Sequence, residues 1–304
     1  MRRRTVLRNA VKALVPFQPQ LRRLKRWVSP YHDDPSNSKY ALEQGLQQIQ
    51  LLQRAGVDLT GDVLEFGTGW LPIIPLLFYL AGSRSVVLTD VERLLDPHTT
   101  AKAKQVVASH LATVARVLGK PEEDLARRLD GDFAPAYLVP WQSRCHPSRS
   151  VDIVISRAVL EHIPPSALSN FLGEFVRIVR PGGAMCHVVD NSDHWEHQDK
   201  TISRVNFLRY EDGWFWRLAC LNRQAYQNRL RHSDYLALFH QHGWTTLIAE
   251  GTPDEKCLSD LRTLPLAKRF ADRDHRDLAI LTSAFVLRHI AATAPAPANE
   301  LVSQ

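Results

Sequence analysis

The sequence of 304 residues has few cysteines and lacks long hydrophobic runs. The four cysteines are widely spaced: Cys145, Cys186, Cys220 and Cys257. They form no C-x-x-C pair and no small secreted framework, which favours a reducing, cytoplasmic setting. No apolar run reaches the roughly 18 residues of a membrane helix, because Pro72 and Pro75 interrupt the longest one, residues 71–81. We therefore expect a cytoplasmic protein without a membrane span.

Acidic residues are absent from residues 1–30, which carry nine of the 38 arginines and lysines. The remaining chain has 29 basic against 32 acidic residues, so the net charge of +6 comes from this basic arm. A slightly acidic body argues against a nucleic-acid partner. Apolar residues recur at helical spacing beside the cations, so residues 1–30 are a candidate for peripheral contact with the inner face of an anionic membrane. A solvated arm, or a helix packed on the domain, is the alternative.

The most informative motif is a short strand followed by a glycine turn. Residues 63–66 form an apolar run that contains Glu65, and Gly67 and Gly69 follow. Glycine lets the chain reverse tightly and keeps Cβ atoms away from a ligand, so the turn and the apolar helix after it predict a cradle for a nucleotide-like cofactor. Pro72 stands where the dinucleotide fingerprint has its third glycine, which disfavours a nicotinamide cofactor. A glycine turn without a ligand is the third interpretation.

Strands and amphipathic helices alternate along the rest of the chain. The expected strands are residues 62–66, 85–89, 136–141, 151–156, 184–189, 245–249 and 278–287. The expected helices are residues 42–52, one long helix from Thr99 or Thr100 to Leu118, residues 165–180 and residues 233–242. This alternation predicts an α/β fold with a doubly wound, mostly parallel sheet.

Two downstream segments carry a family resemblance. The first runs from Val151 to Pro165 and reads VDIVISRAVLEHIPP, and the second runs from Glu174 to Gly183 and reads EFVRIVRPGG. Together with the E-x-G-x-G turn that starts at Glu65, they resemble the class I S-adenosylmethionine-dependent methyltransferases. The resemblance implies a seven-stranded doubly wound sheet with helices on both faces, methyltransferase activity, and S-adenosyl-L-methionine as the cofactor.

The resemblance also implies which residues bind the cofactor. These are Glu65, Gly67, Gly69, Trp70, Asp90, Gln142 and Ser156. The glycine turn with Glu65 shapes the pocket for the methionine end, and Asp90, after the second strand, accepts hydrogen bonds from the ribose hydroxyls. For the adenine amine we prefer Gln142 to Asp132, since an amide oxygen can accept that hydrogen bond. Leu71 replaces a glycine that the family often has, so we expect a wider loop with Trp70 packed on the cofactor.

Several ionisable residues follow the fifth expected strand or lie within it. They are His187, Asp190, Asp193, His194, Glu196 and His197. Ligands of open parallel sheets bind beyond the carboxyl ends of the strands, so Asp190 and His194 are predicted to be catalytic, as a base or as substrate contacts. His187 lies inside the strand and is interpreted as a packed side chain. Oxygen and nitrogen ligands are dense around His194 and His197, so a metal site is one alternative, but their spacing matches no specific motif and no metal ligand is assigned. An ordinary polar loop is the other alternative.

Aromatic residues are concentrated in residues 191–231, which hold seven of the 25 aromatics of the chain. This insertion is either a lid or wall for the substrate, or a helical hairpin with a small core of its own. The expected organisation is a basic helical arm and leading helix at residues 1–58, a methyltransferase-like domain at 59–290, and a disordered tail at 291–304.

The function expected from these features is methyl transfer to a small-molecule, saccharide or lipid-linked acceptor, with oxygen as the preferred acceptor atom. Two other interpretations stay open. One is a non-catalytic module that keeps the fold for binding or as a scaffold, and the other is an NAD-dependent oxidoreductase. The intact glycine turn and Asp90 argue against the non-catalytic module.

Overall fold

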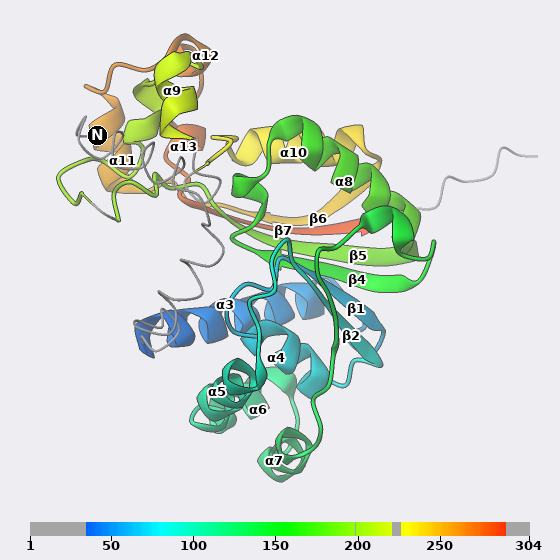
Figure 1. Cartoon of the computed structure of the whole chain (residues 1–304). Coiled ribbons are helices and arrows are strands. Elements are labelled where there is room, and N and C mark those ends of the chain that lie inside the picture. The colour runs from blue at the N-terminus through cyan, green and yellow to red at the C-terminus, as the bar shows by residue number, and fades with distance from the viewer. Residues whose placement is uncertain (1–34, 198, 221–225, 290–304) are drawn as a thin grey trace, which may run out of the picture.

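A computed structural model of the chain describes residues 35–197, 199–220 and 226–289. The predicted basic arm at residues 1–30 and the predicted tail at 291–304 lie outside the described residues. Seven strands form one sheet in the order β3-β2-β1-β4-β5-β7-β6 (Figure 1). The strands are β1 (Asp62–Phe66), β2 (Ser85–Thr89), β3 (Ala136–Leu138), β4 (Val151–Arg157), β5 (Val179–Asp190), β6 (Trp244–Glu250) and β7 (Thr282–His289). β7 runs antiparallel to β5 and β6, and the expected mostly parallel, doubly wound sheet is confirmed.

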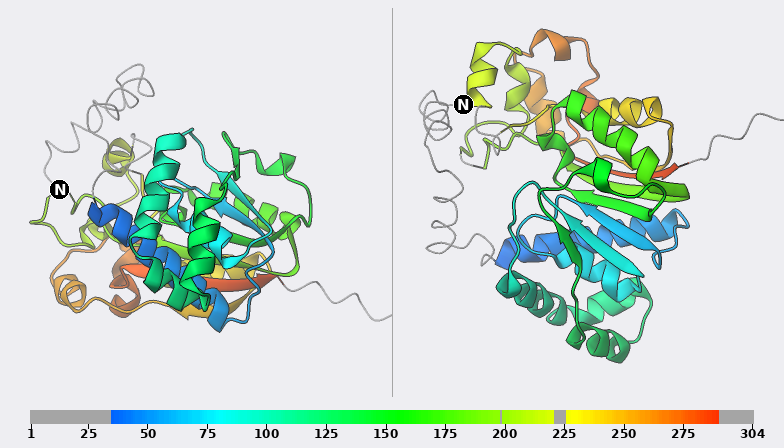
Figure 2. Two further views of the ribbon diagram at one scale, coloured as in Figure 1. Left: turned by 90° about the horizontal axis from the view of Figure 1, so that it is seen from below. Right: turned by 45° about the vertical axis from the view of Figure 1, so that its right-hand side comes forward.

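Helices cover both faces of the sheet (Figure 2). One layer consists of α3 (Pro35–Arg54), α4 (Ile73–Ala81), α5 (Pro97–Ala108), α6 (Leu111–Leu118) and α7 (Glu122–Asp130). The opposite layer consists of α8 (Pro165–Ile178) and α10 (His232–Gln241). Successive residues of a central strand therefore face different cores: Val63 packs in the core under α3 and α4, and Leu64 packs in the core under α8. Because both faces are covered, the central strands read as nearly continuous apolar runs.

The long helix expected up to Leu118 is two helices, α5 and α6. The chain breaks between them, where Ser109 Oγ donates to the carbonyl oxygens of Gln105 and Val106 at 3.0 Å. Such side-chain bonds compete with the helical backbone pattern, which explains the break. The helix start also differs from the prediction, because the side chain of Asp96 accepts a hydrogen bond from Thr99 N and forms a capping box with it.

The aromatic insertion packs against a second insertion that the sequence did not reveal. Residues between β6 and β7 form α11 (Glu255–Leu261), α12 (Lys268–Ala271) and α13 (His275–Leu278), which lie next to α9 (Trp214–Ala219) in Figure 1. The insertion and these helices share one hydrophobic core, which includes Phe207, Trp216 and Phe270. The strand expected at 278–287 starts only at Thr282, because α13 occupies the residues before it.

Membrane crossing finds no support in the described part of the chain. Within residues 35–197, 199–220 and 226–289, no helix is both long enough and apolar enough to cross a membrane. Membrane contact through residues 1–30 concerns residues outside this part and stays a prediction.

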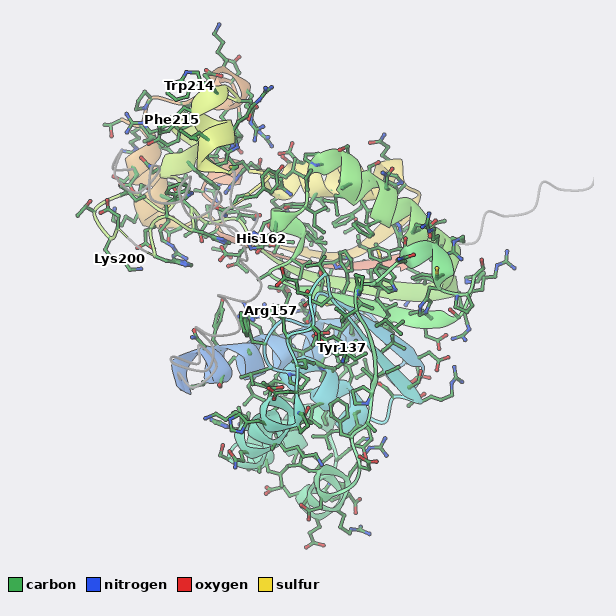
Figure 3. All side chains as sticks on the ribbon, viewed as in Figure 1. Tyr137, Arg157, His162, Lys200, Trp214 and Phe215 are labelled. Atoms are coloured by element: carbon green, nitrogen blue, oxygen red, sulfur yellow. The ribbon has the colours of Figure 1, made fainter. Side chains whose placement is uncertain are left out.

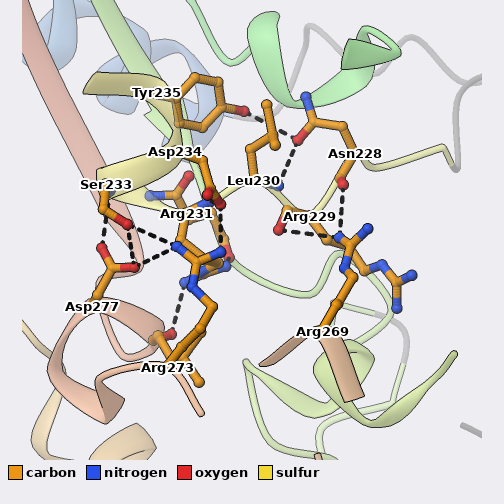
Figure 4. Close-up of polar contacts among 12 residues, drawn as sticks. Asn228, Arg229, Leu230, Arg231, Ser233, Asp234, Tyr235, Arg269, Arg273 and Asp277 are labelled. Carbon is orange, nitrogen blue, oxygen red and sulfur yellow. Dashed lines mark hydrogen bonds and ion pairs between the residues drawn. The ribbon is translucent and has the colours of Figure 1, made fainter. Parts of the chain in front are cut away.

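Buried arginine side chains join the two insertions to the sheet (Figure 4). Arg231 is fully buried and donates hydrogen bonds to the carbonyl oxygens of Asn191, Leu278 and Ile280 at 2.7 to 2.8 Å. Burial lowers its pKa to about 10, so it remains protonated at neutral pH. One guanidinium therefore holds the end of β5 and the segment before β7 together.

We expect Arg231→Ala to lower the free energy of unfolding by about 3 kcal/mol or more, because it leaves buried carbonyl groups without donors. Chemical denaturation measures this loss. The exposed Arg262→Ala is the matched control and is expected to change the unfolding free energy by less than about 0.5 kcal/mol. Equal effects of the two substitutions would contradict the structural role of Arg231.

Candidate functional site

The strand order reverses between β1 and β4, since β2 and β3 lie beyond β1 on one side and β5 lies beyond β4 on the other. Ligands of open parallel sheets bind at such a switch point, beyond the carboxyl ends of the strands. This edge carries the glycine turn after β1, Asp90 after β2, the 3-10 turn η3 (Leu160–His162) after β4, and Asp190 at the end of β5. The candidate site therefore draws on four strand ends.

The glycine turn leaves open space at the strand ends. Gly67 (φ +81°) and Gly69 (φ +71°) both adopt the left-handed conformation that favours glycine. A Cβ atom on Gly67 would lie 2.5 Å from Val159 Cγ2, so Gly67 lets the turn pack against the segment after β4. A Cβ atom on Gly69 would meet no atom within 4 Å, so the turn leaves room for a ligand beside Gly69.

Asp90 fastens this turn to the end of β2. Its Oδ2 accepts a hydrogen bond from Gly69 N at 2.9 Å, and its Oδ1 accepts one from Val91 N at 2.7 Å. A carboxylate offers about four lone-pair positions, so both oxygens can accept further hydrogen bonds from ligand hydroxyls. Asp90 thus caps the strand end and also borders the space beside Gly69.

Glu65 is a buried carboxyl group with an unpaired oxygen. Its residue is 4% exposed, and its Oε2 makes no hydrogen bond. Burial raises the pKa of Glu65 to about 8, and the negative charge of Asp90 adds to the increase. A cationic amino group bound at the turn would pair with this carboxylate and bring its pKa back down. The residues present therefore fit a ligand with an amino-acid end.

Trp70 and Gln142 lie near the same edge. Trp70 is half-buried in the turn itself, and Gln142 is exposed at the start of a short 3-10 turn. The neighbouring Trp141 N donates to the carbonyl oxygen of Asp90 at 3.1 Å. The Gln142 segment thus lies beside the end of β2, while Asp132, the other adenine candidate, is exposed after α7.

Ser156 does not face the same side of the sheet as Glu65. The β1–β4 pairing sets Glu65 beside Ile155, which packs in the core under α3 and α4. Since side chains alternate along a strand, Ser156 points to the opposite layer, where its Oγ lies 2.7 Å from His187 Nδ1. His187 is fully buried and stacks on the rings of Phe175 and Phe239. Its interpretation as a packed side chain is confirmed, whereas Ser156 is not brought to the Glu65 side.

Asp190 and His194 form a close polar pair at the end of β5. His194 Nε2 lies 3.3 Å from Asp190 Oδ2. Burial raises the pKa of Asp190, but the hydrogen bonding and charge of His194 outweigh it and bring the pKa to about 2. Val188, two residues before Asp190, packs in the core under α3 and α4. Asp190 therefore belongs to the Glu65 side of the sheet.

Glu161 and His162 complete this polar group, although the sequence did not single them out. Glu161 is 2% exposed, its Oε1 accepts a hydrogen bond from Asp190 N at 3.4 Å, and its Oε2 has no partner. Burial, with the charge of Asp190 second, raises the pKa of Glu161 well above its ordinary value. Both residues lie in the segment that carries the family resemblance. The sequence signal that could have identified them is a pair of ionisable residues shortly after an apolar strand.

The segment at residues 226–228 positions this group. Asn228 N donates to the carbonyl oxygen of Glu161 at 2.8 Å, and Asn228 Nδ2 donates to that of Leu160 at 2.8 Å. Gln227 Oε1 accepts a hydrogen bond from His194 N at 3.0 Å. One short segment therefore fixes both η3 and the loop after β5.

The other ionisable residues of that loop serve its own structure. Asp193 is buried, and its Oδ1 accepts a hydrogen bond from Trp195 N at 2.9 Å. Burial raises the pKa of Asp193 to about 6. The ring of His197 stacks on that of His194, with 5.5 Å between the ring centroids.

Tyr40 and Arg157 border the group from the side of α3. The Arg157 guanidinium lies 4.9 Å from the centroid of the Tyr40 ring, and its Nε donates to Gln44 Oε1. Burial raises the pKa of Tyr40, and the charge of Asp190 contributes to the increase. Figure 3 shows Arg157 and His162 at the same end of the sheet. A half-exposed aromatic ring and a guanidinium thus flank the acidic group.

Comparisons with known proteins agree with this geometry. A family model described as a methyltransferase domain matches residues 37–248. No curated protein matches the chain by sequence.

Solved structures of methyltransferases are similar to the chain at low identity. A putative sarcosine dimethylglycine methyltransferase from Galdieria sulphuraria is 13% identical, with 82% of this chain and 86% of that chain covered and a TM-score of 0.47. Magnesium protoporphyrin IX methyltransferase from Synechocystis PCC 6803, with bound SAH, is 12% identical, with 82% of each chain covered and a TM-score of 0.44. An S-adenosylmethionine dependent methyltransferase from Mesorhizobium loti is 12% identical, with 78% and 95% covered and a TM-score of 0.43.

The raised pKa of Glu65 predicts a pH-dependent stability. The unfolded carboxyl ionises near pH 4.5 and the folded one only near pH 8, so the folded state holds an extra proton in between and loses stability as the pH rises. We expect Glu65→Gln to remove this loss and to gain stability over the wild type from pH 5 to 8, by up to about 1.4 kcal/mol per pH unit. Urea denaturation across this range measures the difference. The exposed Glu123→Gln should show no such trend, and a parallel pH profile for Glu65→Gln and the wild type would contradict the assignment.

Proposed function

The chain belongs to the methyltransferase-domain family and is an S-adenosylmethionine-dependent methyltransferase, and on this basis we propose that it methylates an oxygen of a small-molecule, saccharide or lipid-linked acceptor. Family membership decides against the nicotinamide enzyme and the non-catalytic module. The observation that carries the proposal is the Asp190–His194 pair at the end of β5, on the same side of the sheet as Glu65.

The cofactor is proposed to lie across the ends of β1 and β2. Glu65 would pair with the amino group of its methionine end, because this carboxyl has a buried oxygen without a partner. Asp90 would accept hydrogen bonds from the ribose hydroxyls, and the open space beside Gly69 would admit the ligand. Trp70 and Gln142 are proposed to contact the adenosine part. Ser156 supports the site by packing, since its side chain bonds His187.

The cofactor supplies an electrophilic methyl group on a sulfonium sulfur, and the protein supplies position. As the acceptor oxygen forms its bond to the methyl carbon, the carbon–sulfur bond breaks and its electron pair stays on sulfur. A hydroxyl acceptor must also lose its proton, because hydroxyls remain protonated near neutral pH. The Asp190–His194 pair is proposed to promote this loss, and the site holds the acceptor in line with the methyl group.

The surroundings of the pair support the proposed acceptor class. The Tyr40 ring, 49% exposed, and the Arg157 guanidinium flank the polar group and offer a wall and a polar contact for a hydroxylated molecule. The body of the chain after residue 30 carries more acidic than basic residues, which disfavours a nucleic-acid substrate.

Calorimetry tests the cofactor site. We expect the wild type to bind S-adenosylhomocysteine and not NAD, and Asp90→Ala to weaken this binding at least tenfold, or about 1.4 kcal/mol, because it removes the proposed ribose acceptor. The exposed Asp124→Ala is the control and should bind like the wild type. Unchanged affinity in a folded Asp90→Ala protein would contradict the assignment.

Methyl transfer from labelled S-adenosylmethionine to fractionated cell extract tests the acceptor site. We expect His194→Ala to lower kcat by about 100-fold or more while S-adenosylhomocysteine affinity is retained, as removal of a group that assists proton loss does. The exposed His240→Ala is the matched control. Full activity of His194→Ala, or label found only on nitrogen or carbon acceptors, would refute the proposal.

A further inference from the structure

Three side chains with metal-binding atoms converge at the ends of β4 and β5. Glu161, His162 and His194 each offer one such atom, and these atoms all lie within 4.8 Å of one another. A cation about 2.0 to 2.4 Å from each ligand atom, with angles of about 90° to 120° between the ligands, holds those atoms about 2.8 to 4.2 Å apart. The three atoms are therefore close enough to bind one ion after small side-chain movements.

The hydrogen bonds of His162 prepare its ring for such a role. His162 Nδ1 lies 2.8 Å from the carbonyl oxygen of Tyr226 and must donate to it, since a carbonyl oxygen only accepts. In the neutral ring, Nε2 then carries the free lone pair. A histidine that binds a metal usually donates its other N–H to a carbonyl or carboxylate in this way.

Glu161 gives the second, independent observation. Its side chain is almost inaccessible to solvent, yet Oε2 has no hydrogen-bond partner. Buried polar oxygens are normally satisfied, so an unpaired one that faces two imidazoles calls for a partner. The centroids of the His162 and His194 rings lie 5.0 Å apart, so protonation of both rings would place two positive charges side by side. A bound metal ion satisfies the carboxylate and both neutral rings together.

Supporting contacts hold the group in place from outside. Asn228 fixes the backbone of η3, Gln227 fixes the backbone of His194, and Asp190 Oδ2 approaches the His194 ring at 3.3 Å. Such outer partners orient metal ligands and keep their rings basic.

We propose that Glu161, His162 and His194 form a binding site for one divalent transition-metal cation. Two imidazoles and one carboxylate suit Mn²⁺, Fe²⁺, Co²⁺ or Zn²⁺ better than Mg²⁺ or Ca²⁺, which prefer oxygen ligands, and three protein ligands leave positions open for a substrate. The cation's role rests on the proposed function: it would hold the acceptor hydroxyl and lower its pKa. The Asp190–His194 pair would then promote proton loss by holding the cation through His194, and the proton would pass to water. The absence of a recognisable spacing in the sequence reflects ligands from two separate segments.

Calorimetric titration of chelator-treated protein with MnCl₂ and with ZnCl₂ tests the site. We expect one Mn²⁺ or Zn²⁺ per chain, and at least tenfold weaker binding by Glu161→Gln and by His162→Ala. His240→Ala, an exposed histidine on α10, is the matched control and should bind like the wild type. Wild-type binding of neither ion, or unchanged binding by both variants, overturns the proposal.

A second measurement needs no substitution. In the wild type, Zn²⁺ is expected to shift the ring nitrogen NMR signals of His162 and His194 and to leave that of His240 unchanged, and unshifted signals for the first two overturn the site. Binding of S-adenosylhomocysteine, measured in parallel, separates the two proposals. If the protein binds the metal ion but not the cofactor, the proposed function alone is refuted. If it binds the cofactor but not the metal ion, the metal site alone is refuted.

Discussion

The constraint on which the site depends is the burial of two carboxyl groups that are not fully hydrogen-bonded. Glu65 and Glu161 are each almost inaccessible to solvent, and each has an oxygen without a hydrogen bond. Burying such a group costs several kcal/mol unless it is neutralised or paired. Both lie at the carboxyl edge of the sheet: Glu65 is the second-last residue of β1, and Glu161 lies in η3 after β4. A fold tolerates this cost at a site where a ligand supplies the missing partner, so we propose that the two carboxyls mark the two halves of one site.

The last residues of the aromatic insertion, just before α10, link this site to the rest of the molecule. Asn228 bonds the backbone of η3, the Arg229 guanidinium lies 3.9 Å from the centroid of the Trp216 ring, and Arg231 bonds three carbonyl groups near β5 and β7. Three side chains of one short segment thus reach the site, the insertion core and the sheet. These contacts restrict the conformation of the loop after β5.

The sequence predicted what local patterns determine and missed what depends on distant contacts. β2 and the start of β1 follow from apolar runs between turn residues, and they agree with the structure to the residue. The break between α5 and α6 was missed because Val107 and Leu111 keep helical spacing across it. Asp190 and His194 were found because they follow a strand end. Glu161 and His162 were not, since their importance comes from burial and from Asn228, which lies 66 or more residues away along the chain. The side of the sheet that Ser156 faces could not be predicted, because it depends on the register of β4 with β1.

The core shared by the two insertions changes how the aromatic residues should be understood. Phe207 and Trp216 are buried against Phe270 from the segment before β7, so they stabilise a small subdomain and do not face a substrate. Trp214, which is 77% exposed, is different, and Figure 3 shows it on the outer part of this subdomain. The interpretation of residues 191–231 as a packed helical unit therefore accounts for most of the aromatic residues. One correction is that the core of this unit also includes side chains from residues 255–281. We therefore propose that substrate selection depends less on these aromatic residues than on the polar group at the ends of β4 and β5 and on the neighbouring Tyr40 and Arg157 side chains.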